Sequence, residues 1–320
     1  MKCRICSNDI NNKQLVLKEM MYGLKDLFDY FQCSNCGCIQ ISEIPANIDK
    51  YYPNDYYSYT AAEVPVKRSA IRSLHFNYHA FNKNKMIGGL LALKFKPSLF
   101  YDWLKVLNLH NRNERVLDIG CGNGQLLKRM YRLGFNDLTG IDPFLNQDTI
   151  YNEHLRLLKK DVFEMEGRYD VIMMHHSLEH MDHQHEVIAK AASLLNNNGR
   201  LLIRIPIVST PLLEKYGVNV ATLDPPRHFF VHSLQSIKIL TKENNLSLYK
   251  TVFDAQVFSI LASEQYTKGI SNVNDSRSYI QNPEGSSFTE EDLARFQQEI
   301  NDYNQRGESD SVALYFKKEY

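Results

Sequence analysis

The segment that most limits the folds open to this 320-residue chain lies between residues 114 and 133. Residues 115–119 (Arg-Val-Leu-Asp-Ile) form a short apolar run typical of a buried strand, and a helix is predicted over residues 125–133. Between them stand Gly120, Gly122 and Gly124. Glycines let the backbone turn tightly and approach a ligand closely, and the first turn of a helix offers free N–H groups. This order of elements predicts an α/β domain that binds a ligand at the turn.

The rest of the chain continues the alternation of strands and helices. Further strands are predicted over residues 138–142, 155–159, 169–174, 200–208, 246–254 and 311–316. Further helices are predicted over residues 184–195 and 233–244, and after a capping box that starts at Thr289, while residues 196–199 read as a turn. The alternation predicts a doubly wound, mostly parallel sheet of seven strands with helices on both faces.

The spacing of the glycines separates two classes of ligand. Dinucleotide sites need G-x-G-x-x-G, but here the pattern is G-x-G-x-G and Gln125 stands in place of the third glycine. Asp118 at the head of the loop fits poorly beside a pyrophosphate. Its carboxylate fits well beside a ligand that carries an ammonium and a sulfonium group.

Residues 118–124 resemble motif I of the class I S-adenosylmethionine-dependent methyltransferases, and three later segments resemble that family in order. Asp142 stands where the family binds the ribose hydroxyls, residues 160–163 where it meets the adenine, and residues 169–172 on the strand beside the methyl-transfer centre. The resemblance implies a Rossmann-like methyltransferase sheet. It also implies a set of cofactor contacts, namely Asp118, Gly120, Cys121, Gly122, Gly124, Asp142, Pro143, Asp161, Val162 and His175. A generic nucleotide-binding or cofactor-free α/β domain is the alternative.

Residues that select the acceptor follow the fourth and fifth strands. Residues 175–185 hold five histidines around a Leu-Glu-His stretch that resembles small-molecule methyltransferases. Residues 226–233 resemble the stretch before the next helix in sugar-modifying methyltransferases, where a histidine serves proton transfer. We predict His228, His180 and His176 as catalytic bases. One alternative is a metal site among the five histidines, although no H-E-x-x-H helix is present. The other is structural: these histidines hold the loop or pack. Asp224-Pro225-Pro226-Arg227 only superficially resembles an amino-methyltransferase motif.

Two C-x-x-C pairs, Cys3 with Cys6 and Cys33 with Cys36, predict a structural Zn²⁺ site with four thiolate ligands. A redox or disulfide role is the alternative, and Cys38 is predicted to be a spare thiol. A small zinc-ribbon-like module before a methyltransferase domain is similar to the architecture of deoxysugar C-methyltransferases.

Composition limits the partners. Lys plus Arg and Asp plus Glu both total 37, so a broad nucleic-acid footprint is not expected, although a local basic patch remains open. No apolar run reaches the length of a membrane span and no signal peptide is recognised, so we expect a cytoplasmic protein without a membrane partner. We divide the chain into a zinc-binding module over 1–45, a Tyr-rich and helical linker or lid over 46–110, and a methyltransferase domain over 111–320. The tyrosines of residues 51–59 either line the acceptor pocket or clamp the domains together.

The resemblance implies methyl transfer from S-adenosylmethionine to a small biosynthetic metabolite, and a nucleotide-linked sugar is the acceptor considered first. Carbon, oxygen and nitrogen all stay open as the methylated atom. A methyltransferase for RNA or protein, with the zinc module as a substrate clamp, is one alternative. A binding protein that keeps the fold without catalysis is another.

Overall fold

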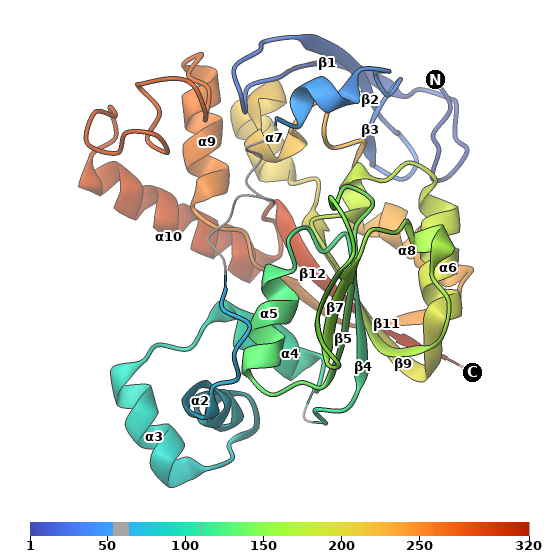
Figure 1. Ribbon diagram of the computed structural model, residues 1–320. Helices are drawn as coiled ribbons and strands as arrows, with labels where there is room; N and C mark the ends of the chain where they lie inside the picture. Colours follow the sequence, from blue (N-terminus) through green and yellow to red (C-terminus); the bar gives the residue numbers. More distant parts are fainter. Residues whose placement is uncertain (54–63, 110, 320) are drawn as a thin grey trace.

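A computed structural model describes residues 1–53, 64–109 and 111–319 of the chain (Figure 1). Within these ranges the strands form two sheets, one of eight strands and one of four. The order across the larger sheet is β11 (Leu246–Phe253), β12 (Ser311–Lys318), β9 (Leu195–Pro206), β8 (Tyr169–His175), β4 (Arg115–Ile119), β5 (Asp137–Ile141), β7 (Leu155–Leu158) and β6 (Thr149–Asn152).

The five central strands, from β9 to β7, are parallel, as expected for a Rossmann-like sheet. The strand β12 runs antiparallel to both β9 and β11, and β6 runs antiparallel to β7 at the edge. All seven predicted strands are present. The prediction missed β6, because its four residues lie at the sheet edge and none is buried, so they carry no apolar pattern.

The predicted turn at residues 196–199 lies inside β9 instead. Tyr169 pairs with Leu195 and Val171 pairs with Arg200, so the residues between Leu195 and Arg200 are extra length on one strand. They bulge out of the ladder and do not end it.

The predicted helices are found as α5 (Gln125–Arg132), α6 (Gln184–Leu194), α8 (Leu234–Lys242) and α10 (Glu290–Arg306). The predicted capping box is formed, since the Thr289 hydroxyl accepts a hydrogen bond from the backbone of Asp292, whose carboxylate accepts one from the Thr289 backbone. Two further helices, α7 (Thr210–Tyr216) and α9 (Phe258–Thr267), follow the central strands. Short 3₁₀ turns complete the connections, namely η1 (Ile48–Tyr51), η2 (Val162–Glu164), η3 (Leu178–His180), η4 (Gly217–Asn219) and η5 (Ala221–Leu223).

Three helices precede the larger sheet: α2 (Ala70–Phe81), α3 (Lys85–Lys94) and α4 (Leu99–Val106). Pro97 lies between α3 and α4, where it cannot interrupt a helix. Phe76 of α2 and Tyr101 of α4 are buried against Phe135, so these two helices pack on the sheet's own core. In Figure 1, α3 lies at the outer edge of the molecule, beyond α2.

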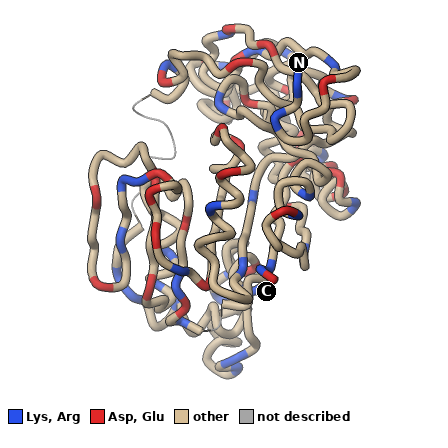
Figure 2. The backbone as a smooth tube through the Cα atoms, turned by 90° about the vertical axis from the view of Figure 1, so that its right-hand side faces the viewer, with Lys and Arg blue, Asp and Glu red and all other residues tan. Residues whose placement is uncertain are grey.

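The smaller sheet consists of β1 (Lys13–Lys18), β2 (Leu27–Gln32), β3 (Ile39–Ile41) and β10 (Phe230–Val231). The last strand comes from far along the chain, and it pairs antiparallel with β3. Ile39, Ile41 and Phe230 belong to one buried cluster that continues into the larger sheet. Sequence pattern did not predict β10, because two residues are too few to show one. In the view of Figure 2, both signs of charge are interspersed over the smaller sheet. Of the helices in the described ranges, none combines the length and the apolar character that crossing a bilayer requires.

Candidate active site

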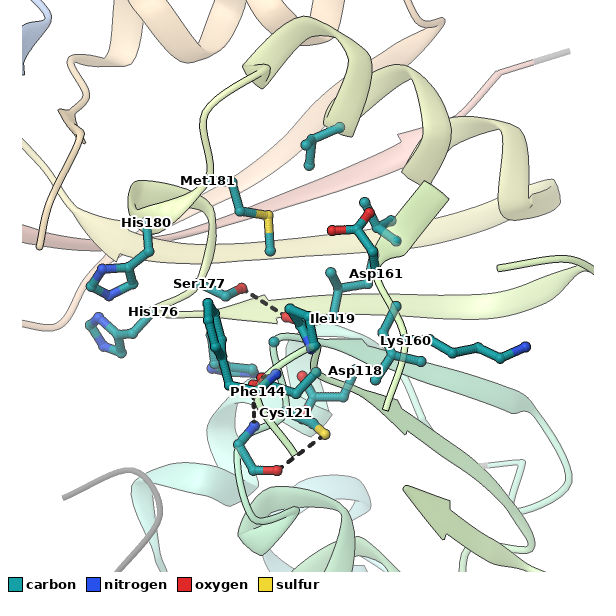
Figure 3. Close-up of a pocket in the computed structure, with 18 of the residues that line it drawn as sticks. Asp118, Ile119, Cys121, Phe144, Lys160, Asp161, His176, Ser177, His180 and Met181 are labelled. Carbon is teal, nitrogen blue, oxygen red and sulfur yellow. Dashed lines mark hydrogen bonds between the residues drawn. The ribbon is translucent and has the colours of Figure 1, made fainter. Parts of the chain in front are cut away.

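A cavity of about 540 Å³ opens at the carboxyl ends of β4, β5 and β8 (Figure 3). Most of the predicted site residues line it, namely Asp118, Gly120, Cys121, Gly122, Asp142, Pro143, Asp161, Val162, His175, His176 and His180. Gly124 and His228, also predicted, are not among the lining residues. The segments were predicted one by one, and the parallel sheet brings their ends to one edge.

The glycine-rich loop leaves β4 in a conformation that only glycine adopts readily. Gly120 has a φ of +74°, and a Cβ built on it would lie 2.3 Å from Cβ of Ser177. Ser177 in turn donates a hydrogen bond of 2.7 Å to the Ile119 carbonyl, as Figure 3 shows. Gly124 is the residue before α5, and a Cβ there would lie 2.6 Å from Leu157. The loop therefore packs tightly against β7 and the β8 turn, and its glycines cannot be replaced without displacing neighbours.

Asp118 is a buried carboxylate that lacks a cation. It is 2% exposed, and its Oδ1 has no hydrogen-bond partner among the described residues. Burial, and then the nearby Asp142, raise its pKa to about 8. Since an unpaired carboxyl group in such a place is costly, the site fits a ligand with a positive group, such as the ammonium of S-adenosylmethionine.

Asp142 directly follows β5, and both of its carboxylate oxygens accept hydrogen bonds. Oδ2 accepts from the Gly122 backbone N–H at 3.0 Å, and Oδ1 accepts from the Phe144 backbone N–H at 2.9 Å. Burial raises the pKa of Asp142, and these two N–H groups oppose the rise. Each oxygen keeps a further lone pair, so the carboxylate can still accept from two ribose hydroxyls.

The side of the cavity near Asp161, where the adenine is predicted to bind, is apolar and open. Phe144 is 70% exposed and Phe163 is 47% exposed, and both line the cavity. Asp161 caps η2 by accepting from the Phe163 backbone N–H at 2.9 Å. Neither phenylalanine was predicted from the sequence. Phe144 stands only two residues after Asp142, and an apolar residue so close to a predicted ribose contact could have indicated it.

Glu179, His180 and His228 converge in the region where the acceptor is predicted to bind. Their ligand atoms all lie within 4.8 Å of one another, and Glu179 is fully buried. Nδ1 of His180 lies 2.7 Å from the Arg227 carbonyl, and Nδ1 of His228 lies 2.8 Å from the Thr222 carbonyl. Since a carbonyl only accepts, both Nδ1 atoms carry a proton. Nε2 of His180 is then the ring nitrogen that can accept a further proton, close to the Glu179 carboxylate.

The charge states fit this arrangement. Burial raises the pKa of Glu179, but the neighbouring His176, His180 and His228 outweigh burial and hold the pKa at about 2. Burial lowers the pKa of His180 to about 4, against the pull of Glu179. Glu179 is therefore ionised and His180 is unprotonated at neutral pH. Nδ1 of His176 lies 3.3 Å from Glu179 Oε1, so the third predicted base belongs to the same group.

Residues from the N-terminal part reach this cluster. The Tyr52 hydroxyl lies 3.2 Å from Nδ1 of His180, and its ring stacks near Phe144 with centroids 6.5 Å apart. Tyr52 lines the cavity, which supports the pocket interpretation of the tyrosine stretch, although Tyr56, Tyr57 and Tyr59 lie outside the described residues.

Arg227 is fully buried and donates to Glu19 at 2.9 Å and to Asp224. Asp224 and Arg227 thus form part of a buried ionic group. The residues of this segment that superficially resemble an amino-methyltransferase motif therefore serve in a buried ion-pair group.

His175 is the last residue of β8 and lines the cavity. It is 4.9 Å from the Trp103 ring, centroid to centroid, and burial lowers its pKa well below the usual value. The imidazole is thus neutral and offers packing and one polar atom to the cavity, but no charge.

The four cysteines of the N-terminal pairs converge at the tip of the smaller sheet. Sγ of Cys3 lies 3.6 Å from Sγ of Cys36, and Sγ of Cys6 lies 3.4 Å from Sγ of Cys33. All four sulfur atoms lie within 4.8 Å of one another. The Gln40 amide donates to Sγ of Cys3 at 3.1 Å, as expected beside a thiolate. Four sulfur atoms this close fit a tetrahedral Zn²⁺, whereas Cys38 lies outside the group.

The buried state of Asp118 leads to a measurable prediction. In the free protein near pH 7 the raised pKa keeps most of Asp118 protonated, so pairing with a ligand ammonium should expel close to one proton (about 0.9). Calorimetry of S-adenosylmethionine binding in buffers of different ionisation enthalpy measures this release directly. Asp118→Asn should remove both the release and most of the affinity, whereas Glu153→Gln, a change at an exposed carboxylate, should alter neither. Binding without proton release would contradict the pairing.

Known proteins match the part of the chain that forms this cavity. Residues 94–251 match a family described as a methyltransferase domain. The ubiquinone biosynthesis O-methyltransferase of Pelagibacter ubique is 28% identical over 190 residues, which cover 53% of this chain and 76% of that protein. The 27-O-demethylrifamycin SV methyltransferase of Amycolatopsis mediterranei is 33% identical over 104 residues, which cover 28% of this chain and 38% of that protein.

Among solved structures, a geranyl diphosphate C-methyltransferase from Streptomyces coelicolor has a TM-score of 0.48 and 14% identity. The match covers 86% of this chain and 100% of that chain. The residues matched by the family include the glycine-rich loop, Asp142 and the histidine-rich segment, but not the cysteine pairs.

Proposed function

Because this chain is an S-adenosylmethionine-dependent methyltransferase, we propose that it methylates a hydroxyl group of a small biosynthetic metabolite, with a histidine base taking the proton. The observation that carries the proposal is the place of His180. Its unprotonated Nε2 belongs to the same cavity as the glycine-rich loop, and its Nδ1 is held by a backbone carbonyl.

The cofactor supplies an activated methyl group on a sulfonium, so the protein has to orient the partners and remove a proton. We propose that the loop around Asp118 holds the methionyl end and that Asp142 holds the ribose. The acceptor oxygen forms the new bond to the methyl carbon while the carbon–sulfur bond breaks, and the bonding pair stays on sulfur. The acceptor proton passes to Nε2 of His180. Glu179 stabilises the imidazolium that results.

Oxygen as the methylated atom is favoured by the names of the similar curated proteins, which include O-methyltransferases. As the acceptor class we propose a nucleotide-linked sugar, since Tyr52, which lines the cavity beside His180, offers an aromatic face on which a sugar ring packs. We further propose that residues 1–45 bind a structural zinc ion, that residues 46–110 form a linker or lid, that residues 111–320 carry catalysis, and that the enzyme works in the cytoplasm.

The test is transfer of labelled methyl from S-adenosylmethionine to a panel of acceptors. The panel contains nucleoside diphosphate sugars, free sugars, catechols as analogues of quinone precursors, an RNA pool and a protein pool. We expect turnover with nucleotide-linked sugars and an ether linkage in the product, found by mass spectrometry. Turnover only with catechols would retain the reaction and reject the sugar. Turnover only with RNA or protein would reject the small-molecule proposal.

A further inference from the structure

One segment of this electrically balanced chain is strongly basic. Residues 64–101 contain seven Lys or Arg residues and no Asp or Glu, a net charge of +7, whereas the whole chain has 37 of each sign. The seven are Lys67, Arg68, Arg72, Lys83, Lys85, Lys94 and Lys96. Among the carboxylates that the structure describes, none forms an ion pair with any of these seven. The charge of the segment is therefore available to a partner.

The helix α3 in the middle of this segment exposes apolar side chains. Met86 is 87% exposed, Leu90 is 70% exposed and Leu93 is 86% exposed. Ile87 and Phe95 beside them are 56% and 45% exposed. Isolated exposed apolar residues are ordinary, but five in a stretch of ten residues form a patch that needs a partner.

The arrangement around the helix separates three kinds of side chain. At about 100° per residue, Met86, Leu90 and Leu93 fall within about 60° of one another. Gly88 falls on the opposite side, where a Cβ would lie 2.4 Å from Tyr78 of α2, so this side is the one that packs on the protein. On the same wheel, Lys94 falls about 40° beyond Leu90 on one side of the stripe, and Lys85 falls about 80° beyond Leu93 on the other. Lys83 and Lys96 lie just beyond the two ends of the helix.

We propose that α3 docks this protein onto the surface of an anionic lipid bilayer, with Met86, Leu90 and Leu93 in the interface and the lysines against the headgroups. An apolar stripe with lysines on both margins is the arrangement of an interfacial helix, because each long lysine side chain reaches the phosphate level while the stripe is buried. Binding to a nucleic acid would use the basic charge of this segment but not the exposed apolar side chains of α3. Pairing with a second copy of this neutral chain would use the apolar side chains but not the basic charge. The bilayer accounts for both.

The position of the segment connects the docking helix to the cavity. The Val64 backbone N–H donates to Oε1 of Gln125 at 3.0 Å, and Gln125 lines the cavity. Ser69, the cap of α2, donates through its backbone to Arg132 at the other end of α5. The basic segment therefore starts at the mouth of the active site. The docking proposal stands independently of the acceptor proposed above, since it concerns residues outside the cavity.

Flotation with lipid vesicles tests the proposal on the full chain. We expect the protein to float with vesicles of phosphatidylcholine that contain one quarter phosphatidylglycerol, to stay unbound with pure phosphatidylcholine, and to lose binding as salt rises. The double change Leu90→Glu with Leu93→Glu should reduce binding about tenfold or more. Changing Lys83, Lys85, Lys94 and Lys96 to Gln should reduce it about fivefold per lysine.

Matched controls carry the same changes elsewhere. Ile150→Glu places a charge at a 63% exposed apolar residue of the edge strand β6. Changing Lys238, Lys242, Lys250 and Lys317 to Gln removes the same charge from α8, β11 and β12, where all four lysines are exposed. Both controls should bind vesicles as the unchanged protein does, and circular dichroism should show every variant folded.

Three results would overturn the proposal. The first is an unchanged protein that does not float with anionic vesicles. The second is binding that the controls lose as strongly as the α3 variants. The third is a protein that does not bind vesicles but binds a single-stranded RNA oligonucleotide. A protein that does not bind vesicles but forms a dimer, which the Leu90 and Leu93 changes convert to a monomer, would count in the same way.

Discussion

Changing Cys3 and Cys36 to Ser together is expected to remove zinc and to melt the smaller sheet, with a fall in Tm of more than about 10 °C. The two sulfur atoms lie 3.6 Å apart and are buried in the core that the smaller sheet shares with the larger one. A four-thiolate site contributes its binding energy directly to folding. Metal analysis should find one zinc ion per unchanged chain, and the ion should remain when S-adenosylmethionine is removed.

The loss should spread to the active site, and this is what makes the expected effect large. The Tyr30 hydroxyl of β2 donates to the His228 carbonyl at 2.9 Å, and Arg227 pairs with Glu19. Without the smaller sheet, the buried Arg227 would lose a partner, which costs about 3–5 kcal/mol when one member of a buried pair is removed. Cys38→Ala is the control, because Cys38 is buried but lies outside the four-sulfur group. A chain without zinc that melts at the same temperature with and without a chelator would contradict the site.

Replacing His180 by Ala should lower turnover by about 10²–10⁴-fold and leave the affinity for S-adenosylmethionine nearly unchanged. The side chain lines the cavity from the acceptor side, whereas the proposed cofactor contacts lie on the glycine-rich loop and at the ends of β5 and β7. His228→Ala should act in the same direction, because the His228 ring packs against that of His180 and helps to position it. Single-turnover rates and calorimetric affinities separate the two quantities.

The pH profile adds a readout that a structural role would not change. A base with a pKa of about 4 is unprotonated from pH 6 to 8, so the turnover number should be flat there and fall only as pH approaches the pKa from above. Glu179→Gln removes the charge but keeps the shape, and it should reduce turnover without changing the fold. His154→Ala, which changes a histidine bonded to the Asn136 carbonyl, is the control. Normal turnover in both His180→Ala and His228→Ala, or a second metal ion bound by the cluster, would contradict the base.

Several features of this site could be predicted because they are local in sequence. Asp118 and the three glycines stand within seven residues, and strand order alone brings Asp142 and residues 161–162 to the same edge. The two cysteine pairs were visible for the same reason, since each pair spans four residues. Capping at Thr289 was also visible, because it involves residues three apart.

Other features depend on contacts between distant residues, which periodicity does not reveal. Glu179 is part of a familiar short stretch, but its burial beside His228 depends on a contact 49 residues along the chain. Tyr52 reaches His180 from 128 residues away, and Arg227 meets Glu19 across 208 residues. The strand β10 is two residues long and β6 has no buried residue, so neither has a pattern to recognise.

The pairing of β10 with β3 has a consequence for how the protein can be divided. The Phe229 carbonyl accepts from the Ile41 backbone N–H at 3.0 Å, and the Phe229 N–H donates to the Glu179 carbonyl at 2.8 Å. A shortened protein that began at residue 46 would keep the glycine-rich loop, yet it would leave a bare backbone edge next to the proton-accepting cluster. The strand β3 thus covers the backbone of the segment that leads to Glu179. If residues 1–45 hold the proposed zinc ion, loss of the metal would disturb the Glu179 cluster as well as the smaller sheet.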